Sequence, residues 1–275
     1  MENQFILEMK NISKSFSGVQ VLYHVDLQIK AGEIRALVGE NGAGKSTLMK
    51  VLGGILQKDT GEILIQGEKK SIDSVNDAKE NGIALIHQEI SLVQALSIAE
   101  NIFLGREPMG RNGLVDLKKI HRDTKEIMAK MGLQLDSHTL VKDLSISQQQ
   151  MVEICRALAS QAKIIVMDEP TASLTDKEIR YLFEQIRKLQ QEKVAIIYIS
   201  HKMDEIFEIS DSISVLRDGK HVVTVQTKET EYKEVIRHMV GRDLDSFYAK
   251  RIEKAGEKIL EIKEQIGRAS CRERV

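Results

Sequence analysis

Two hydrophobic patterns divide the chain, and the first occupies its N-terminal part. Apolar and polar positions alternate around Ile6, Met9 and Ile12, and again in VDLQIK at residues 25–30. Such alternation is typical of half-buried antiparallel strands. The segment GEILIQGE at residues 61–68, bounded by glycines, predicts one more short strand.

The second pattern consists of four short, continuous apolar runs. They are IRALVG ending at Gly39, IALIHQ ending at Gln88, KIIVMDEP ending at Pro170 and VAIIYISH ending at His201. Runs of this length suit strands buried on both faces of a parallel sheet, and helical patterns such as residues 177–191 separate them. The alternation predicts an α/β fold with a mostly parallel sheet core and an antiparallel β subdomain. Because ligands bind beyond the carboxyl ends of strands in open α/β sheets, the polar residues that end these runs are expected at one edge.

Two further regions complete the predicted organisation. Residues 88–143 carry helical patterns without strand signals, and with the helix that follows Ser147 they predict an inserted helical subdomain at about residues 90–160. The segment ISVLRDGKHVVTV predicts a hairpin that turns at its Asp-Gly pair. We therefore assign residues 1–245 to one domain.

The C-terminal end repeats a short piece of the N-terminus. ILEIK at residues 259–263 echoes ILEMK at residues 6–10. We expect residues 246–266 to be a linker and the start of a truncated second copy of the domain. The last segment, GRASCRERV at residues 267–275, matches nothing after the first copy and is expected to be an expression-derived tail without function.

Composition narrows the classes of protein that fit. The chain has 275 residues, 42% hydrophobic and 29% charged, as expected of a soluble globular protein. Its formal net charge of -1 gives no bulk electrostatic sign of nucleic-acid binding, and two cysteines argue against a disulfide scaffold. The N-terminus lacks a secretory signal, and no apolar run approaches the ~18 residues that span a bilayer. If the protein works at a membrane, another chain must supply the spans.

The segment GENGAGKST fits the G-x-x-x-x-G-K-[ST] pattern of the phosphate loop of P-loop NTPases, between a predicted strand and an apolar helix. Its glycines let backbone N–H groups curl around phosphate oxygens, and the helix N-terminus adds positive potential. Lys45 is expected to reach the β- and γ-phosphates of ATP, and the Ser46 hydroxyl to ligate Mg²⁺. The alternative is a glycine-rich turn without a ligand. The expected nucleotide-binding residues of the loop are Gly39, Glu40, Asn41, Gly42, Ala43, Gly44, Lys45, Ser46 and Thr47.

Two adjacent carboxylates end the run KIIVMDEP. Asp168 is expected to hold Mg²⁺, as the strand-end aspartate of P-loop NTPases does, and Glu169 to orient and deprotonate the attacking water. The alternative is a cap on the turn before Pro170. Gln88 and His201 follow two other runs. The glutamine can hydrogen-bond water or a metal-bound ligand, and the histidine can contact a γ-phosphate, although either residue alone is more often structural.

The segment DLSISQQQMVEICRAL at residues 143–158 predicts an amphipathic helix with an apolar face that includes Met151, Ile154 and Cys155. Serines and glutamines crowd its first turn. On their own they are typical of helix capping.

The order of these motifs resembles that of the ATP-binding-cassette (ABC) ATPases. The resemblance covers residues 5–245, and HQEISLVQALSIAENIFLGRE and LSISQQQMVEICRAL look like the sugar-importer branch, of the ribose and galactose type. In that branch the ATPase subunit usually carries two tandem cassettes. The resemblance therefore makes this chain the first cassette and explains the ILEIK echo.

The resemblance also assigns a role to the helix start. LSISQ stands where the family has the signature LSGGQ, which implies that Ser145, Ser147 and Gln148 bind the γ-phosphate held by a partner cassette in a head-to-tail sandwich. Both family glycines are replaced. Ile146 is familiar in this branch, whereas Ser147 adds a Cβ where backbone should approach phosphate closely, which puts the efficiency of the signature in doubt.

Three other residues carry over. Phe16 matches the aromatic residue on which adenine stacks, and the alternative is a hydrophobic core residue. Gln88 matches the glutamine that senses the γ-phosphate, helps to ligate the metal and links the site to the membrane subunits. In ASLTD, Thr175 stands where the family has aspartate, so Ser173 carries over only weakly.

The resemblance implies an ATPase that uses ATP and Mg²⁺ to power import of a monosaccharide at the cytoplasmic face of a bacterial plasma membrane. Its expected partners are a second cassette (in the same native chain or as a homodimer), permease subunits that dock on the helical segment after Gln88, and indirectly a sugar-binding protein, with no nucleic acid. One alternative is a soluble cassette protein acting on DNA or the ribosome, which the lack of sustained heptads and basic arms disfavours. The other is a nucleotide-binding regulator with little turnover, against which the intact Lys45, Asp168, Glu169 and His201 argue.

Overall fold

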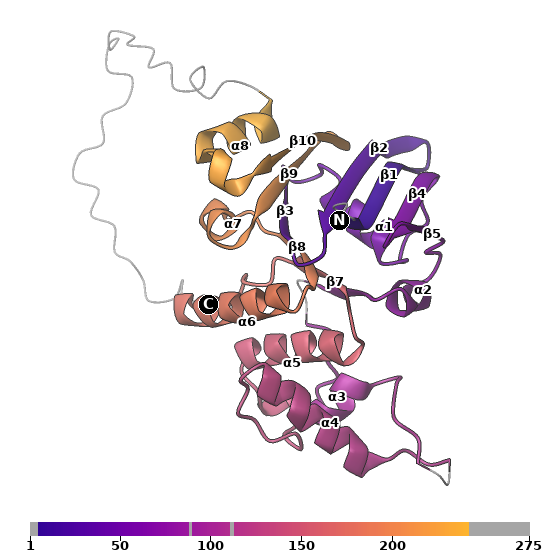
Figure 1. Cartoon of the computed structure of the whole chain (residues 1–275), viewed down its shortest axis with the longest axis vertical. Helices are drawn as coiled ribbons and strands as arrows, with labels where there is room; N and C mark the ends of the chain where they lie inside the picture. The colour runs from indigo at the N-terminus through magenta and orange to yellow at the C-terminus, as the bar shows by residue number, and fades with distance from the viewer. Residues whose placement is uncertain (1–4, 88–89, 111–112, 242–275) are drawn as a thin grey trace, which may run out of the picture. The chain divides into compact units, whose positions relative to one another are not determined.

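The computed structural model describes residues 5–87, 90–110 and 113–241, all within one compact unit of the chain. The N-terminal strands form a four-stranded antiparallel sheet in the order β2-β1-β4-β5 (Figure 1). The predicted antiparallel strands are thus confirmed. Their bounds are Phe5–Phe16 for β1, Val19–Lys30 for β2, Thr60–Ile65 for β4 and Glu68–Lys70 for β5.

Strands β1 and β2 are longer than the alternating segments predicted them to be. Their pairing shifts register at several points, one of them between Met9 and Ile12, where Asn11 has a φ of 53°. Each irregularity interrupts the two-residue period. The pattern therefore reads as short pieces although the strands are continuous.

A six-stranded sheet forms the centre of the unit, in the order β10-β9-β3-β8-β7-β6. The four apolar runs become β3 (Ile34–Val38), β6 (Ile83–Ile86), β7 (Ile164–Asp168) and β8 (Ala195–Ile199). These four strands are neighbours, and every pairing among them is parallel. Their carboxyl ends therefore share one edge, as predicted. The predicted hairpin is also confirmed, as β9 (Ser212–Arg217) and β10 (Lys220–Gln226).

Successive residues of the central strands pack into different layers. Val166 and Ile197 join a core with helix α1 (Lys45–Leu52), whereas Ile165 and Ile196 join a core with α5 (Ile146–Ala159) and α6 (Asp176–Gln191). Burial of each such side chain stabilises the fold by ~1.5–3 kcal/mol. This two-sided burial explains why the runs are continuously apolar. The unit also contains α2 (Val75–Glu80), α7 (Met203–Ile209), α8 (Tyr232–Val240) and two 3₁₀ turns, Val141–Asp143 and Thr227–Glu229.

Helices α3 (Ile98–Phe103), α4 (Leu117–Lys130) and α5 pack together within the range predicted for the helical subdomain (Figure 1). Two isolated β-bridges, Ser97–Leu140 and Met109–Val115, add to it. The prediction of a single buried face on α5 was too narrow. Val152 and Glu153 are buried as well, because α5 lies between α3, α4 and β6.

None of the helices within the described ranges is long and apolar enough to cross a bilayer. Three predictions fall outside those ranges: the role of Gln88, the linker at residues 246–266 and the tail at residues 267–275.

Candidate functional site

The phosphate loop connects β3 to α1. Helix α1 begins at Lys45, and its N-cap, Gly44, has a φ of 99°, which favours glycine. Gly39 is required for a different reason. A Cβ there would lie 2.2 Å from the carbonyl oxygen of Leu216, so only glycine lets the loop pack against β9.

The β9–β10 hairpin supports this loop from outside the motif. Gly219 in the hairpin turn donates its N–H to the carbonyl of Ala43 at 3.2 Å and accepts the N–H of Tyr23 at 2.7 Å. Sequence reasoning identified the hairpin but not this contact, since nothing local in the sequence connects Gly219 with a loop so far away in the chain.

The side chain of Lys45 bends back and contacts its own loop. Its ammonium Nζ donates to the carbonyl of Gly39 at 2.7 Å and to that of Glu40 at 3.0 Å. Burial lowers the pKa of Lys45, and the charges of Asp168 and Glu169 partly oppose that shift. The two strand-end carboxylates are therefore close enough to act electrostatically on the loop lysine.

The ends of β7 and β8 bring Glu169 and His201 together. Asp168 pairs with Ile199 in register, and the Glu169 N–H donates to the Ile199 carbonyl at 2.9 Å. Glu169 has a φ of 48°, an uncommon conformation that costs ~1 kcal/mol outside glycine. Its Oε1 lies 3.0 Å from Nδ1 of His201. At the shared sheet edge, two of the predicted catalytic side chains, Glu169 and His201, are therefore in direct contact.

Asp168 has the character of a cation ligand. Burial, and then the charge of Glu169, raise its pKa, while His87, Lys45 and Lys50 lower it. Within the described residues, its carboxylate makes no hydrogen bond or ion pair. The Asp168 carboxylate and the exposed hydroxyl of Ser46 supply the hard oxygen donors that Mg²⁺ prefers. The residues present thus fit the predicted metal, and Gln88, the third predicted ligand, lies outside the described ranges.

Phe16 is not a core residue. Its side chain is 42% exposed at the end of β1, and the Nζ of Lys14 lies 5.5 Å from the ring centroid. The core alternative is therefore wrong, and the exposed ring leaves the adenine platform as the remaining prediction.

The helix start at Ser145 is capped, as its composition predicted. The hydroxyl of Ser145 accepts the Gln148 N–H at 3.3 Å, and Oε1 of Gln148 accepts the Ser145 N–H at 2.9 Å. The hydroxyl of Ser147 lies 3.0 Å from that of Ser145. Ile146 between them is exposed. The cap occupies the Gln148 N–H, which leaves the N–H groups of Ile146 and Ser147 at this helix end for an anion.

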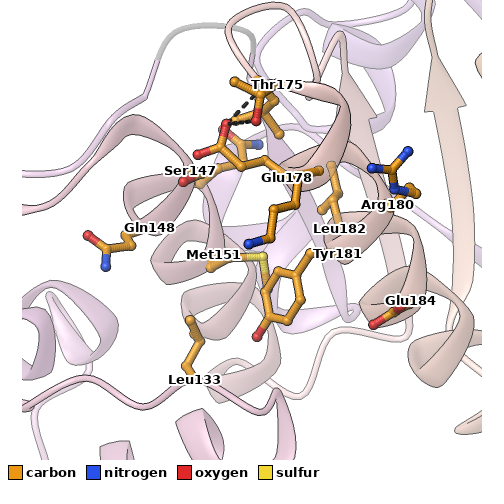
Figure 2. Close-up of a pocket in the computed structure, with 13 residues that line it drawn as sticks. Leu133, Ser147, Gln148, Met151, Thr175, Glu178, Arg180, Tyr181, Leu182 and Glu184 are labelled. Atoms are coloured by element: carbon orange, nitrogen blue, oxygen red, sulfur yellow. Dashed lines mark hydrogen bonds between the residues drawn. The ribbon is translucent and has the colours of Figure 1, made fainter.

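Two of the three departures from the family motifs, Ser147 and Thr175, lie near one carboxylate, that of Glu178 (Figure 2). Glu178 accepts both the N–H and the hydroxyl of Thr175 at 2.8 Å, in a capping box that starts α6. The Ser147 hydroxyl also acts on this carboxylate, and together with the hydrogen bonds from Thr175 it lowers the pKa of Glu178. Residues at the starts of both α5 and α6 therefore act on one carboxylate. Glu178 borders a cavity of about 600 Å³ between the two helices, and Leu133, Met151 and Tyr181 also line it.

Comparison with known proteins identifies relatives of similar sequence. The family model described as "ABC transporter" matches residues 22–172. The chain is 49% identical over 262 residues to the galactose/methyl galactoside import ATP-binding protein MglA 1 of Photobacterium profundum. It is 50% identical over 257 residues to the ribose import ATP-binding protein RbsA of Caldanaerobacter subterraneus. These matches cover 95% and 94% of this chain but 53% and 52% of the relatives, so the chain spans about half their length.

Solved structures agree on the fold. A nucleotide-free ATP-binding cassette from an ABC transporter superposes with a TM-score of 0.74 at 24% identity, over 86% of this chain and 96% of that one. The dimeric post-hydrolysis cassette MJ0796, bound to ADP and Pi, gives a TM-score of 0.69 at 25% identity, over 80% of this chain and 98% of that one. The predicted P-loop NTPase fold is confirmed.

Proposed function

The chain belongs to the ABC transporter family, and on that premise we propose that it is an ATP-hydrolysing subunit that powers import of a monosaccharide. The observation that carries the proposal is the contact of Glu169 with His201 beside the loop of Lys45. The names of the relatives, which are galactose and ribose import ATP-binding proteins, support the transport assignment. The chain would work at the cytoplasmic face of a bacterial plasma membrane.

Each residue at the sheet edge has a separate role in ATP hydrolysis. Lys45 exchanges its hydrogen bonds to the loop carbonyls for the β- and γ-phosphates of ATP. Glu169 accepts a proton from the attacking water, and its 3.0 Å contact with His201 holds the carboxylate in place. His201 faces the γ-phosphate, and Phe16 carries the adenine.

Magnesium would be held by Asp168 and Ser46, and Gln88 is the remaining proposed ligand. When bound, the ion supplies positive charge that stabilises the phosphates in the transition state. Its binding would also relieve the electrostatic cost that raises the pKa of Asp168.

A second cassette would complete the site. Ser145, Ser147 and Gln148 would bind the γ-phosphate held by the partner's phosphate loop, because a helix N-terminus with neutral donors suits an anion that must leave after each cycle. The dimeric state of the MJ0796 cassette supports this arrangement. The partner would be a second cassette of the same native chain or a second copy of this one.

A groove beside the helical subdomain would receive the permease. This groove, of about 400 Å³, lies between α2, β6 and the subdomain, and Ile55, Val75 and Leu104 line it. All three are exposed hydrophobic residues. Arg106 and Arg156 add positive charge to the wall. An apolar groove with a charged rim is suited to a short amphipathic segment of another protein. A sugar-binding protein would act through the permease.

The two alternative functions are not favoured. A soluble ATPase acting on DNA or the ribosome has no support in the names of these relatives. A regulator with little turnover would not require the Glu169–His201 contact.

Glu169 is the proposed general base for the attacking water. Glu169→Gln should bind ATP with an affinity close to that of the unaltered chain but lower turnover by at least ~100-fold, since the amide cannot accept the water proton. A steady-state phosphate-release assay beside titration with a fluorescent ATP analogue measures both. Glu184→Gln, at an exposed position of α6, is the matched control. Near-normal turnover of Glu169→Gln would refute the general-base assignment.

A further inference from the structure

A buried carboxylate lies behind the sheet edge and is not used by the mechanism above. Glu205 on α7 is only 7% exposed, and its neighbours Thr171 and Tyr198 are 1% and 0% exposed. A buried charge is retained only where partners compensate for its lost hydration.

Glu205 receives hydrogen bonds from several donors at once. The Thr171 hydroxyl lies 2.9 and 2.7 Å from its two oxygens, and the Tyr198 hydroxyl donates at 2.8 Å. The Ser200 hydroxyl donates at 3.3 Å, and Nζ of Lys202 forms an ion pair at 3.0 Å. Burial alone would raise the pKa of Glu205, but the hydrogen bonds from Thr171, Lys202 and Tyr198 lower it overall. The carboxylate is therefore held ionised by a cluster of polar partners.

Apart from Tyr198 on β8, the partners of Glu205 come from the two loops that carry Glu169 and His201. Thr171 is two residues beyond Glu169, while Ser200 and Lys202 are the immediate neighbours of His201. The loops are also joined directly, since Nζ of Lys202 donates to the Thr171 carbonyl at 3.4 Å.

We propose that Glu205 is a positioning residue that sets the distance between Glu169 and His201 by anchoring both of their loops to one carboxylate. Its role in catalysis rests on the proposed function, since it acts only through those two residues. Glu205 itself touches neither substrate nor reacting atoms. Displacement of a catalytic group by about 1 Å can lower a rate ~100-fold, so an anchor of this kind has kinetic consequences.

The test compares Glu205→Gln with the unaltered full chain. The amide keeps the shape but must point an N–H at surrounding donors, and Lys202 loses its counterion. We expect kcat for ATP to fall ~10- to 100-fold while KM changes less than ~3-fold. In a His201→Ala background the same substitution should cause a smaller further loss, because one of the two residues through which it acts is already gone.

Matched variants separate positioning from general destabilisation. Asp204→Asn removes an exposed charge from the same helix and should leave kcat unchanged. Thr171→Val breaks only the link to the Glu169 loop and should lower kcat, whereas Thr171→Ser, which keeps the hydroxyl, should restore it. This second pair decides the question if Glu205→Gln folds poorly.

Each outcome has a definite meaning. Near-normal kcat in Glu205→Gln or in Thr171→Val overturns the proposal, as does a loss of nucleotide affinity that equals the loss of kcat. If the unaltered chain hydrolyses no ATP even with a second cassette present, the proposed function fails, and hydrogen exchange then tests the anchor by itself. Faster amide exchange at both 171–172 and 199–202 in Glu205→Gln, but not in Asp204→Asn, would support the anchor, and unchanged exchange would refute it.

Discussion

At the residue scale, ionised Asp168 lowers the free energy of unfolding of the ligand-free chain. Its raised pKa, caused first by burial and then by Glu169, means that the folded chain binds a proton there more readily than the unfolded chain does. Ionised Asp168 therefore destabilises the ligand-free fold at pH values above its folded pKa. The cost disappears below the ordinary aspartate pKa of about 4, where both states are protonated.

Asp168→Asn should accordingly raise the melting temperature at pH 8 by roughly 2–4 °C and abolish magnesium-dependent ATP binding. The gain should shrink as the pH falls toward 4, because the parent residue becomes neutral there. Thermal unfolding between pH 4 and 8 measures it. A melting temperature that drops at pH 8 would mean that the carboxylate stabilises the fold.

At the element scale, the start of α5 combines a stabilising cap with a proposed phosphate site. Ser145→Ala should lower stability by about 1 kcal/mol, as expected for a lost N-cap, and lower ATP turnover by at least ~10-fold. Ser74→Ala is the matched control, since Ser74 is also exposed and caps α2 with a capping box of the same kind. Melting temperatures and phosphate release measure the two effects. Equal ATP turnover in both variants would mean that Ser145 caps the helix and does not bind phosphate.

The strands could be predicted from the sequence, whereas the contacts between elements that position the site could not. The central strands were predictable because burial on both faces leaves a continuous apolar run, and the polar residues after each run located Asp168, Glu169 and His201. The contacts that position these residues were not predictable. Gly219 supports the phosphate loop, and Glu205 joins two catalytic loops through distant partners, so no local period or motif marks them. The broad burial of α5 was missed because it depends on three neighbouring elements.

At the scale of the whole molecule, the groove reaches the carboxyl end of β6 at His87, but its wall on α2 holds no predicted site residue, so docking can be altered there without changing the residues of hydrolysis. Val75 is 44% exposed on the groove wall and has no part in the catalytic cluster. A charge there would have to be buried without a partner when a permease docks.

Val75→Glu should therefore lower sugar uptake in cells by at least ~10-fold while ATP turnover of the isolated chain stays unchanged. Leu117→Glu changes an exposed leucine that does not line the groove and serves as the control. If uptake survives Val75→Glu, the groove is not the docking site. If both uptake and isolated turnover fall, the substitution has damaged the fold.

The exposed ring of Phe16 has a practical consequence, because the chain contains no tryptophan. Phe16→Trp would place a single indole fluorophore on the proposed adenine platform, with a larger face for stacking. Its emission should be quenched by ATP in a saturable way, whereas tryptophan in place of the exposed Tyr232 on α8 should not respond. Unchanged emission at saturating ATP would exclude Phe16 from the adenine site. A responsive signal would make nucleotide arrival and departure visible in real time without any attached dye.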